Sequence, residues 1–256
     1  MLGKLLGRRR SRGPVAPPRA PEGTRVYAIG DIHGRADLLR DMHQLIHEDA
    51  YARQCPRNVV VYLGDYVDRG PDSAEVIDIL LDEALPGFES VHLAGNHEDT
   101  VVRFLSDITV APLWLEYGGS ATLYSYGVKP PSMTETDLLR AQADLRERLP
   151  ERHLRFMRDL GLCHVEGDWF FVHAGVKPGI PLEAQQRQDM LWIRGEFLGC
   201  DDDFGKIIVH GHTVSEAPEV RRNRIGIDTG AFMTGCLTCL VLEGERWSFL
   251  QTRPGA

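Results

Sequence analysis

Cysteines and long apolar runs are scarce in this sequence, and each shortage excludes a class of protein. The five cysteines are an odd, widely scattered set, which argues against a disulfide framework. Cys236 and Cys239 form a C-x-x-C inside a strand-like run, where residues three apart face opposite sides, so we expect free thiols rather than a shared zinc or a disulfide. No run reaches the roughly 18 apolar residues of a membrane span, so we expect no transmembrane segment.

The pattern of a secretory leader is also missing. Leu5 and Leu6 are followed at once by the arginines at 8–10, and no apolar segment of signal-peptide length follows. We therefore expect a cytoplasmic protein. With 256 residues, of which 43% are hydrophobic and 26% charged, the chain has an ordinary globular composition and can form one large α/β domain.

Positive charge is concentrated near the start of the chain. The net charge is −8, but residues 1–23 carry a net +5, which leaves −13 for the remainder. An acidic body is a poor surface for duplex nucleic acid, so we expect no nucleic-acid partner. The basic arm at 1–23 is rich in proline and glycine, and we predict a disordered tail that contacts an acidic partner or a membrane surface. The remaining residues, 24–256, are predicted to form one domain.

The first part of this domain has three strand–helix units in succession. Apolar runs at 26–29, 59–63 and 91–94 each end in a polar, glycine-bounded loop, and apolar residues at helical spacing follow. Ser73 is placed to cap the second of these helices. Consecutive units of this kind predict a largely parallel sheet with a site along the carboxyl ends of its strands.

The middle of the chain is less regular. An aromatic, glycine-punctuated segment at 114–127 is followed by a mostly helical pattern over 137–160. We therefore expect a helical cap insertion at about 109–161. Most of its aromatic side chains are expected to pack in the core, with the lining of a substrate groove as the alternative. Strands then return, and a hairpin around Gly244 is predicted to close the domain.

Side chains that bind metals recur at the ends of the predicted strands. They are Asp31, His33, Asp65, Asp68, Asn96, His97, His173 and His212, with Arg69 and Arg194 as nearby cations. Carboxylate and imidazole groups without a thiolate suit manganese, iron or zinc. These candidates outnumber the ligands of one tetrahedral ion, and a carboxylate can bridge two ions about 3.5 to 4 Å apart, so we expect two divalent ions.

Five motifs that contain these residues stand in a fixed order. They are G-D-I-H-G at 30–34, G-D-Y-V-D-R-G at 64–70, G-N-H-E at 95–98, H-A-G at 173–175 and H-G-H-T at 210–213. With them the chain resembles the calcineurin-like metallophosphoesterase superfamily over about residues 25–252. More narrowly, it resembles PPP-type serine/threonine protein phosphatases of the bacterial and lambda phosphatase kind. The resemblance implies an α/β fold in which helices flank a β-sandwich, with the helical cap as an insertion.

Matched residue by residue, the resemblance also assigns roles. Asp31 and His33 would bind the first ion, Asp65 would bridge the two ions, and Asn96, His173 and His212 would bind the second. His97 would be the general acid, oriented by Asp68, while Arg69 and Arg194 would bind the substrate phosphate. His210 and Asp228 would be structural or support the ligands. A hydroxide that bridges the ions would attack phosphorus directly, and we expect manganese, with iron or zinc as alternatives.

More than one substrate class fits this resemblance. A serine/threonine phosphoprotein is the implied substrate, although a small phosphoester fits the same chemistry. Ala94 stands where eukaryotic-type relatives commonly carry an arginine, and Val214 stands where related nucleases and diesterases often place another histidine ligand. The alternatives are a symmetrical hydrolase of dinucleoside polyphosphates such as diadenosine tetraphosphate, and a non-catalytic scaffold of the same fold.

Overall fold

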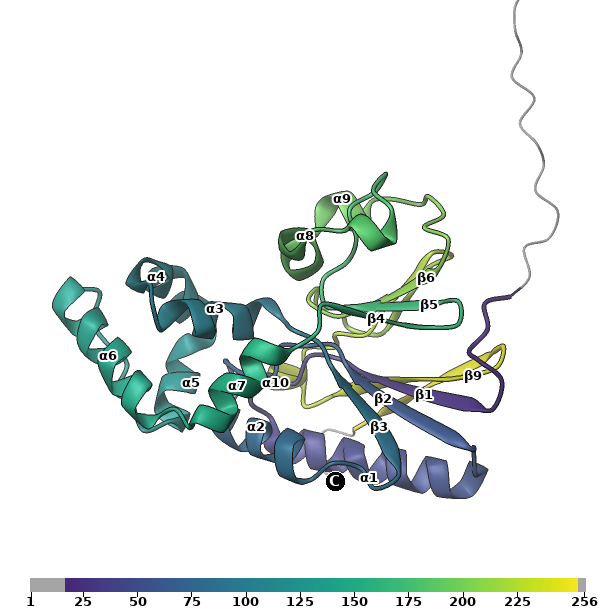
Figure 1. The fold of residues 1–256 in the computed structure, drawn as a ribbon, viewed down its shortest axis with the longest axis horizontal. Coiled ribbons are helices and arrows are strands. Elements are labelled where there is room, and N and C mark those ends of the chain that lie inside the picture. Colours follow the sequence, from purple (N-terminus) through teal and green to yellow (C-terminus); the bar gives the residue numbers. More distant parts are fainter. Residues whose placement is uncertain (1–16, 253–256) are drawn as a thin grey trace, which may run out of the picture.

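Two five-stranded sheets face one another in the computed structural model, which describes residues 17–252 (Figure 1). The first sheet has the strand order β10-β9-β1-β2-β3 and the second has the order β4-β5-β6-β8-β7. Within each sheet three neighbouring strands are parallel, and the remaining strands pair antiparallel. The strands are β1 (Thr24–Ile29), β2 (Arg57–Tyr62), β3 (Phe88–His92), β4 (Cys163–Glu166), β5 (Trp169–Val172), β6 (Ile207–His210), β7 (Glu219–Val220), β8 (Arg224–Gly226), β9 (Thr238–Glu243) and β10 (Arg246–Gln251).

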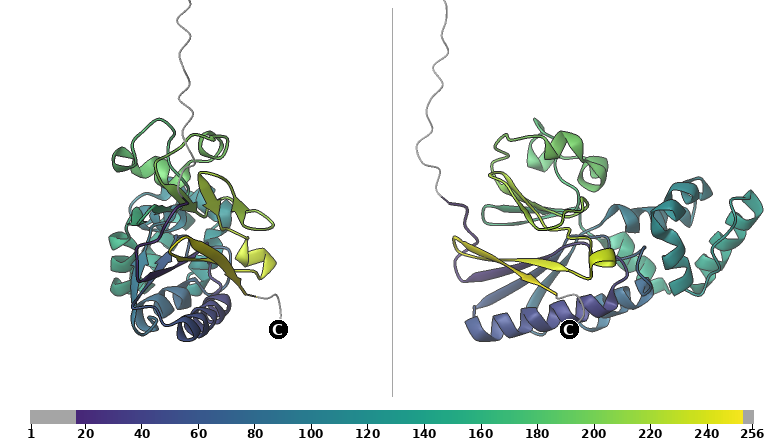
Figure 2. Two further views of the ribbon diagram at one scale, coloured as in Figure 1. Left: turned by 90° about the vertical axis from the view of Figure 1, so that its right-hand side faces the viewer. Right: turned by 180° about the vertical axis from the view of Figure 1, so that it is seen from behind.

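Helices cover the outer faces of this sandwich and extend it at one end. Helices α1 and α2 lie against the first sheet, α8 and α9 lie over the second, and α3 to α7 gather at one end (Figures 1 and 2). The helices and helical turns are α1 (Ala36–Arg53), α2 (Ser73–Asp82), α3 (Asn96–Phe104), η1 (Ile108–Val110), α4 (Ala111–Trp114), η2 (Leu115–Gly119), α5 (Ser120–Ser125), α6 (Glu135–Arg148), α7 (Glu151–Asp159), η3 (Leu182–Ala184), α8 (Arg187–Trp192), α9 (Gly195–Leu198) and α10 (Ala231–Thr234).

The apolar runs of the sequence reflect strands that are buried on both faces. Along β1, Val26 and Ala28 belong to the core between the sheets, whereas Tyr27 and Ile29 pack on the helix side. All four side chains are fully buried. Because successive residues of a strand point to opposite faces, a central strand covered on both sides must be apolar throughout.

The structure confirms the predicted α/β sandwich and refines its elements. Strands β4 to β8 form the second sheet, whereas the last two strands, β9 and β10, extend the first. The third strand is Phe88–His92, displaced from the predicted 91–94. Strands β9 and β10 form the predicted hairpin around Gly244, which has the left-handed φ of 56°. All five cysteines are free thiols, as expected. Within residues 17–252, no helix combines the length and the apolar character that crossing a membrane requires.

Two local predictions have a different outcome. Asp72, not Ser73, is the N-cap of α2, and the Ser73 hydroxyl instead accepts a hydrogen bond from the backbone N–H of Asp68 at 3.0 Å. Most of the predicted arm at 1–23 lies outside the described residues. Its end contacts the domain, because the Ala20 N–H donates to the Gly244 carbonyl and Ala20 is buried.

Acid sensitivity of the core is testable at His43, which packs in the core on α1 with its Nε2 2.8 Å from the Tyr62 hydroxyl. Burial lowers the pKa of His43 to about 4. The unfolded chain takes up this proton near pH 6.5, so the unfolded state binds more protons and stability falls as the pH drops from about 7 towards 4. At pH 5 this costs about 2 kcal/mol. We expect His43→Gln to lose about 2 kcal/mol less than the wild type between pH 7 and pH 5 in urea unfolding. His47→Gln, on the exposed side of α1, should lose as much as the wild type.

Candidate metal centre

The ends of six strands converge on one site between the two sheets. Loops after the carboxyl ends of β1, β2 and β3 supply the motifs at 30–34, 64–70 and 95–98. Loops after β5, β6 and β8 supply His173, His212 and Asp228 from the second sheet. Parallel strands bring their carboxyl ends to the same edge of a sheet, and here two such edges meet.

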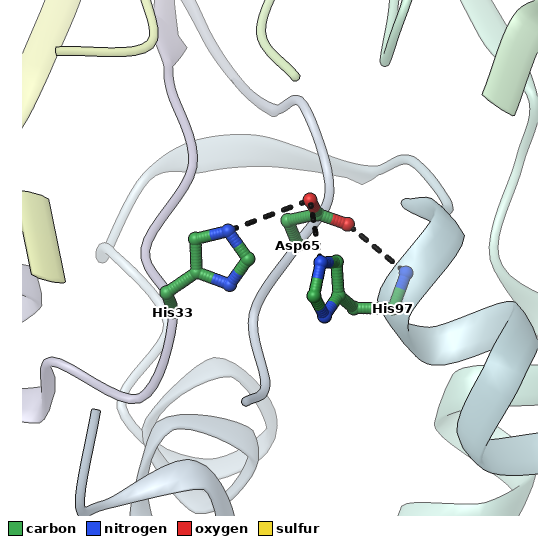
Figure 3. Close-up of side chains that lie close together, drawn as sticks. All are labelled: His33, Asp65 and His97. Atoms are coloured by element: carbon green, nitrogen blue, oxygen red, sulfur yellow. Dashed lines mark hydrogen bonds and ion pairs between the residues drawn. The ribbon is translucent and has the colours of Figure 1, made fainter. Parts of the chain in front are cut away.

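Asp65 lies between two groups of potential metal ligands. Its Oδ2 is 3.5 Å from Nε2 of His33 and 3.8 Å from Nε2 of His97, and Figure 3 shows both rings turned towards the carboxylate. Its Oδ1 is 3.4 Å from Nε2 of His173, which with His212 forms the second group. In each group, Asp65 included, the ligand atoms lie within 4.8 Å of one another. One carboxylate thus offers one oxygen to each group.

His33 and His173 each use Nδ1 for a hydrogen bond to a backbone carbonyl, which leaves Nε2 facing an oxygen of Asp65. His33 Nδ1 is 2.9 Å from the Val67 carbonyl, and His173 Nδ1 is 3.0 Å from the Leu63 carbonyl. Burial lowers the pKa of His33 to about 3 and also lowers the pKa of His173, which favours the neutral form of each ring. A neutral ring that donates from Nδ1 presents a lone pair at Nε2, and here the lone pairs face Asp65 oxygens. These lone pairs and the carboxylate oxygens repel one another, whereas a cation placed between them would be coordinated by both.

Two further buried atoms lack partners. Asp31 Oδ1 and His212 Nε2 are buried without a hydrogen bond, although Asp31 Oδ2 accepts one from the His212 N–H at 2.9 Å. Burial and the neighbouring carboxylates of Asp228 and Asp65 raise the pKa of Asp31 well above its ordinary value. Burial raises the pKa of Asp228 to about 6, again with a contribution from Asp65. A cluster of buried carboxylates with orphaned ligand atoms has the donor set that suits divalent cations, which makes these residues a candidate metal centre.

His97 and Asp68 form a buried pair beside this centre. Nδ1 of His97 is 2.6 Å from Oδ2 of Asp68, which also accepts from the indole N–H of Trp114 at 2.9 Å. The other oxygen, Oδ1, accepts from the Thr122 hydroxyl. Burial alone would favour the neutral ring, but the Asp65 and Asp68 carboxylates raise the pKa of His97 to about 9. The ring is therefore a proton donor at neutral pH, held in place by the helical segment after α3.

The two predicted phosphate-binding arginines flank opposite sides of the centre. Arg69 is half-buried, with its guanidinium 4.6 Å from the Phe232 ring centroid, and its charge influences His33 and His97. Arg194 is exposed, and its charge influences His173 and His212. Among residues 17–252, neither side chain forms an ion pair. Ala94, at the position where eukaryotic-type relatives commonly carry an arginine, is fully buried and adds no positive charge to the site.

The remaining predicted residues also gather here. Asn96 Oδ1 is 3.0 Å from His173 Nε2, which places this amide at the second ligand group. His210 lies outside both groups, with Nδ1 3.0 Å from the Gly211 carbonyl and its ring against Phe197. The structure thus brings together the predicted ligands, the histidine–aspartate pair and both arginines, while His210 is a core residue.

Glu98 is the functional residue that the sequence analysis missed. Its side chain is completely buried, and its two oxygens accept hydrogen bonds from the backbone N–H groups of Asp65, Tyr66, Val67 and Gly95 at 2.7 to 3.1 Å. It therefore fixes the loop that carries Asp65. The signal in the sequence is a capping box, because Glu98 is the third residue of a helix whose N-cap is Gly95.

Comparisons with known proteins agree with this geometry. Residues 24–231 match the sequence profile of the family described as calcineurin-like phosphoesterase. An asymmetrical bis(5'-nucleosyl)-tetraphosphatase, PrpE, of Anoxybacillus flavithermus (strain DSM 21510 / WK1) is 24% identical over 83% of this chain and 88% of its own. A solved structure described as a candidate diadenosine tetraphosphatase covers 92% of this chain and all of its own, with a TM-score of 0.59 and 21% identity.

A more distant structural neighbour is a serine/threonine phosphatase of Saccharomyces cerevisiae. It covers 91% of this chain and 81% of its own, with a TM-score of 0.55 and 14% identity, which shows a shared fold. The expectation of a serine/threonine phosphoprotein phosphatase is wrong, because curated relatives along most of the chain are bis(5'-nucleosyl)-tetraphosphatases. The error has a physical reason: the five motifs describe metal ligands and a proton donor, which act on phosphorus whatever it is attached to.

Replacing one acceptor oxygen of Glu98 should destabilise the folded protein. In Glu98→Gln one oxygen becomes an NH2 group that faces backbone N–H donors, so up to two buried hydrogen bonds are lost. We expect a loss of about 3 kcal/mol in urea unfolding. Glu147→Gln, on the exposed face of α6, is the control and should change stability by less than about 0.5 kcal/mol. Equal stability of the two variants would contradict the role of Glu98.

Asp65 should control both ligand groups at once. We expect the purified wild type to hold about two divalent ions per chain and Asp65→Asn to hold less than about one, because an amide offers one oxygen ligand instead of a charged bridge. Elemental analysis after dialysis measures this directly. Asp41→Asn, an exposed change on α1, should retain the wild-type content. Full metal content in Asp65→Asn would exclude a shared carboxylate ligand.

Proposed function

The chain belongs to the calcineurin-like phosphoesterase family, and from this premise we propose that it is a metal-dependent hydrolase of dinucleoside tetraphosphates. The observation that carries the proposal is the match to bis(5'-nucleosyl)-tetraphosphatases along 83% of the chain. The family match over residues 24–231 includes every strand-end loop of the candidate metal centre. The complete set of ligands and the His97–Asp68 pair argue against a non-catalytic scaffold.

Eight side chains have proposed roles in binding metal and substrate: six would hold the ions, and Arg69 and Arg194 would bind phosphate oxygens. Asp31 and His33 hold one ion, Asn96, His173 and His212 hold the other, and Asp65 contributes to both. Divalent ions held in this way lower the pKa of bound water so that it can act as a nucleophile at neutral pH. Manganese is the ion we propose, with iron or zinc as alternatives. Arg69 orients the phosphate from the His33 side, since a guanidinium fork matches phosphoryl oxygens.

His97 and Asp68 handle the leaving group. Nδ1 of His97 is occupied by Asp68, so the ring presents Nε2 towards Asp65 and the ligand groups. From there it donates a proton to the oxygen that leaves phosphorus. Asp68 holds the ring in this orientation and favours its protonated form. Arg194, on the side of His173 and His212, neutralises further phosphate oxygens of a polyphosphate chain.

The proposed reaction is asymmetrical cleavage. Water adds to one phosphorus of diadenosine tetraphosphate, one phosphoanhydride bond breaks, and the products are AMP and ATP. The alternative expected from the sequence was symmetrical cleavage, which would yield two molecules of ADP. The named relatives are asymmetrical enzymes, and this supports the unequal products.

Turnover of diadenosine tetraphosphate by the manganese-loaded protein tests the proposal. We expect hydrolysis to AMP and ATP, followed by chromatography, with kcat/KM at least about tenfold above that for a phosphoserine peptide, and loss of activity in excess chelator. A preference for the phosphopeptide, or full activity in chelator, would overturn the proposal. ADP as the sole product would retain the substrate class but show that cleavage is symmetrical.

A further inference from the structure

A small cleft opens beside the metal centre, between α3, the segment from η1 to η2, and the end of α8. Its volume is about 170 Å3. Asn96 and His97 are among the residues that line it, so the cleft adjoins both ligand groups. Its walls are mainly apolar and aromatic, with Leu113, Trp114, Tyr117 and Trp192 among them. No role in metal binding or proton transfer accounts for Leu113, Tyr117 or Trp192.

The aromatic rings of the cleft differ in what they do. Trp114 is 2% exposed, and its indole N–H is bonded to Asp68, so it serves the His97–Asp68 pair. Tyr117 is 48% exposed and stands in the wall of the cleft. Trp192 is half-buried, with its ring edge-on to His212 at a centroid distance of 6.3 Å. Tyr117 and Trp192 therefore offer accessible aromatic surface next to both ligand groups.

Two glycines fix this wall against the metal-binding loop. Gly118 has φ of 107°, and a Cβ there would lie 2.8 Å from the backbone N of Arg69. Its carbonyl accepts the Arg69 N–H at 3.2 Å. A Cβ at Gly119 would lie 2.5 Å from the Trp114 ring. The helical turn η2 thus packs directly on the loop of Asp68 and Arg69, so the position of Tyr117 is set by the same contacts that hold the phosphate-binding arginine.

We propose that this cleft binds the base of one nucleoside of the substrate, with Tyr117 and Trp192 as its stacking surfaces. A flat bicyclic base suits a cavity of this size with aromatic walls, since every base has a π-face that stacks on such rings. Arg103 also lines the cleft, and its side chain forms no hydrogen bond or ion pair within residues 17–252, so it is free to meet an anionic phosphate. The inference rests on the proposed function and assigns its base-binding subsite.

The test compares two ligands that differ only in the base. AMP and ribose 5-phosphate are titrated by calorimetry into the manganese-loaded protein, with the integrity of both ligands checked afterwards. We expect the wild type to bind AMP about tenfold more tightly than ribose 5-phosphate, and Tyr117→Ala to remove most of that preference, because base–aromatic stacking has this magnitude. Tyr124→Ala, a tyrosine that is 66% exposed on α5 and outside the cleft, should keep the wild-type preference.

The outcomes separate this inference from the proposed function. Equal affinity of the wild type for both ligands, or an unchanged preference in Tyr117→Ala, overturns the base-binding subsite even if diadenosine tetraphosphate is hydrolysed. A tenfold preference that depends on Tyr117 supports the subsite even if that substrate is not turned over. If Tyr117→Ala is poorly folded, Tyr117→Leu provides the second measurement, because it keeps an apolar side chain but removes the stacking ring. It should lose most of the preference, and an unchanged preference would overturn the subsite.

Discussion

The buried carboxylate of Asp65 is the constraint on which the rest of the structure depends. It faces three imidazoles within 4 Å. Burial raises the pKa of Asp65, but its electrostatic interactions with the neighbouring histidines outweigh burial and hold that pKa below its usual range. Keeping an anion there requires a rigid loop, and the N–H groups bonded to Glu98 supply that rigidity. Of six non-glycine residues with left-handed φ within residues 17–252, five lie in this site: His33, Asp65, Asp68, Arg69 and His212. Backbone strain is concentrated where ligands must be aimed.

The candidate metal centre needs both sheets, because neither sheet supplies all of its residues. The first sheet brings Asp31, His33, Asp65 and Asn96 to its edge, and the second brings His173 and His212 to the same place. Each side of the centre is fixed by long-range contacts, such as His173 Nδ1 against the Leu63 carbonyl and the His212 N–H on Asp31. The apolar core between the sheets, with Trp169 and Phe171 packed on the strands of the first sheet, therefore sets the spacing of the ligand groups.

The helical segment after α3 connects the chemistry to the choice of substrate. Through Trp114 and Thr122 it holds Asp68, which orients His97, and through Gly118 it packs on Arg69. The same segment carries Tyr117 into the cleft next to His97. The five motifs lie outside the stretch from η1 to η2 and describe only metal ligands and the His97–Asp68 pair, so they carry no information about the group attached to phosphorus.

The sequence by itself indicated the fold class, through five ordered motifs and the apolar runs of doubly buried strands, and it named the Asp and His residues that the structure gathers at the strand ends. It did not determine the partition of strands into two sheets, since periodicity reports burial but not the partner strand. Nor did it show Glu98 beneath the Asp65 loop or Tyr117 beside His97. Those relations join residues 30 or more positions apart or depend on a left-handed glycine contact, and only tertiary packing brings such groups together.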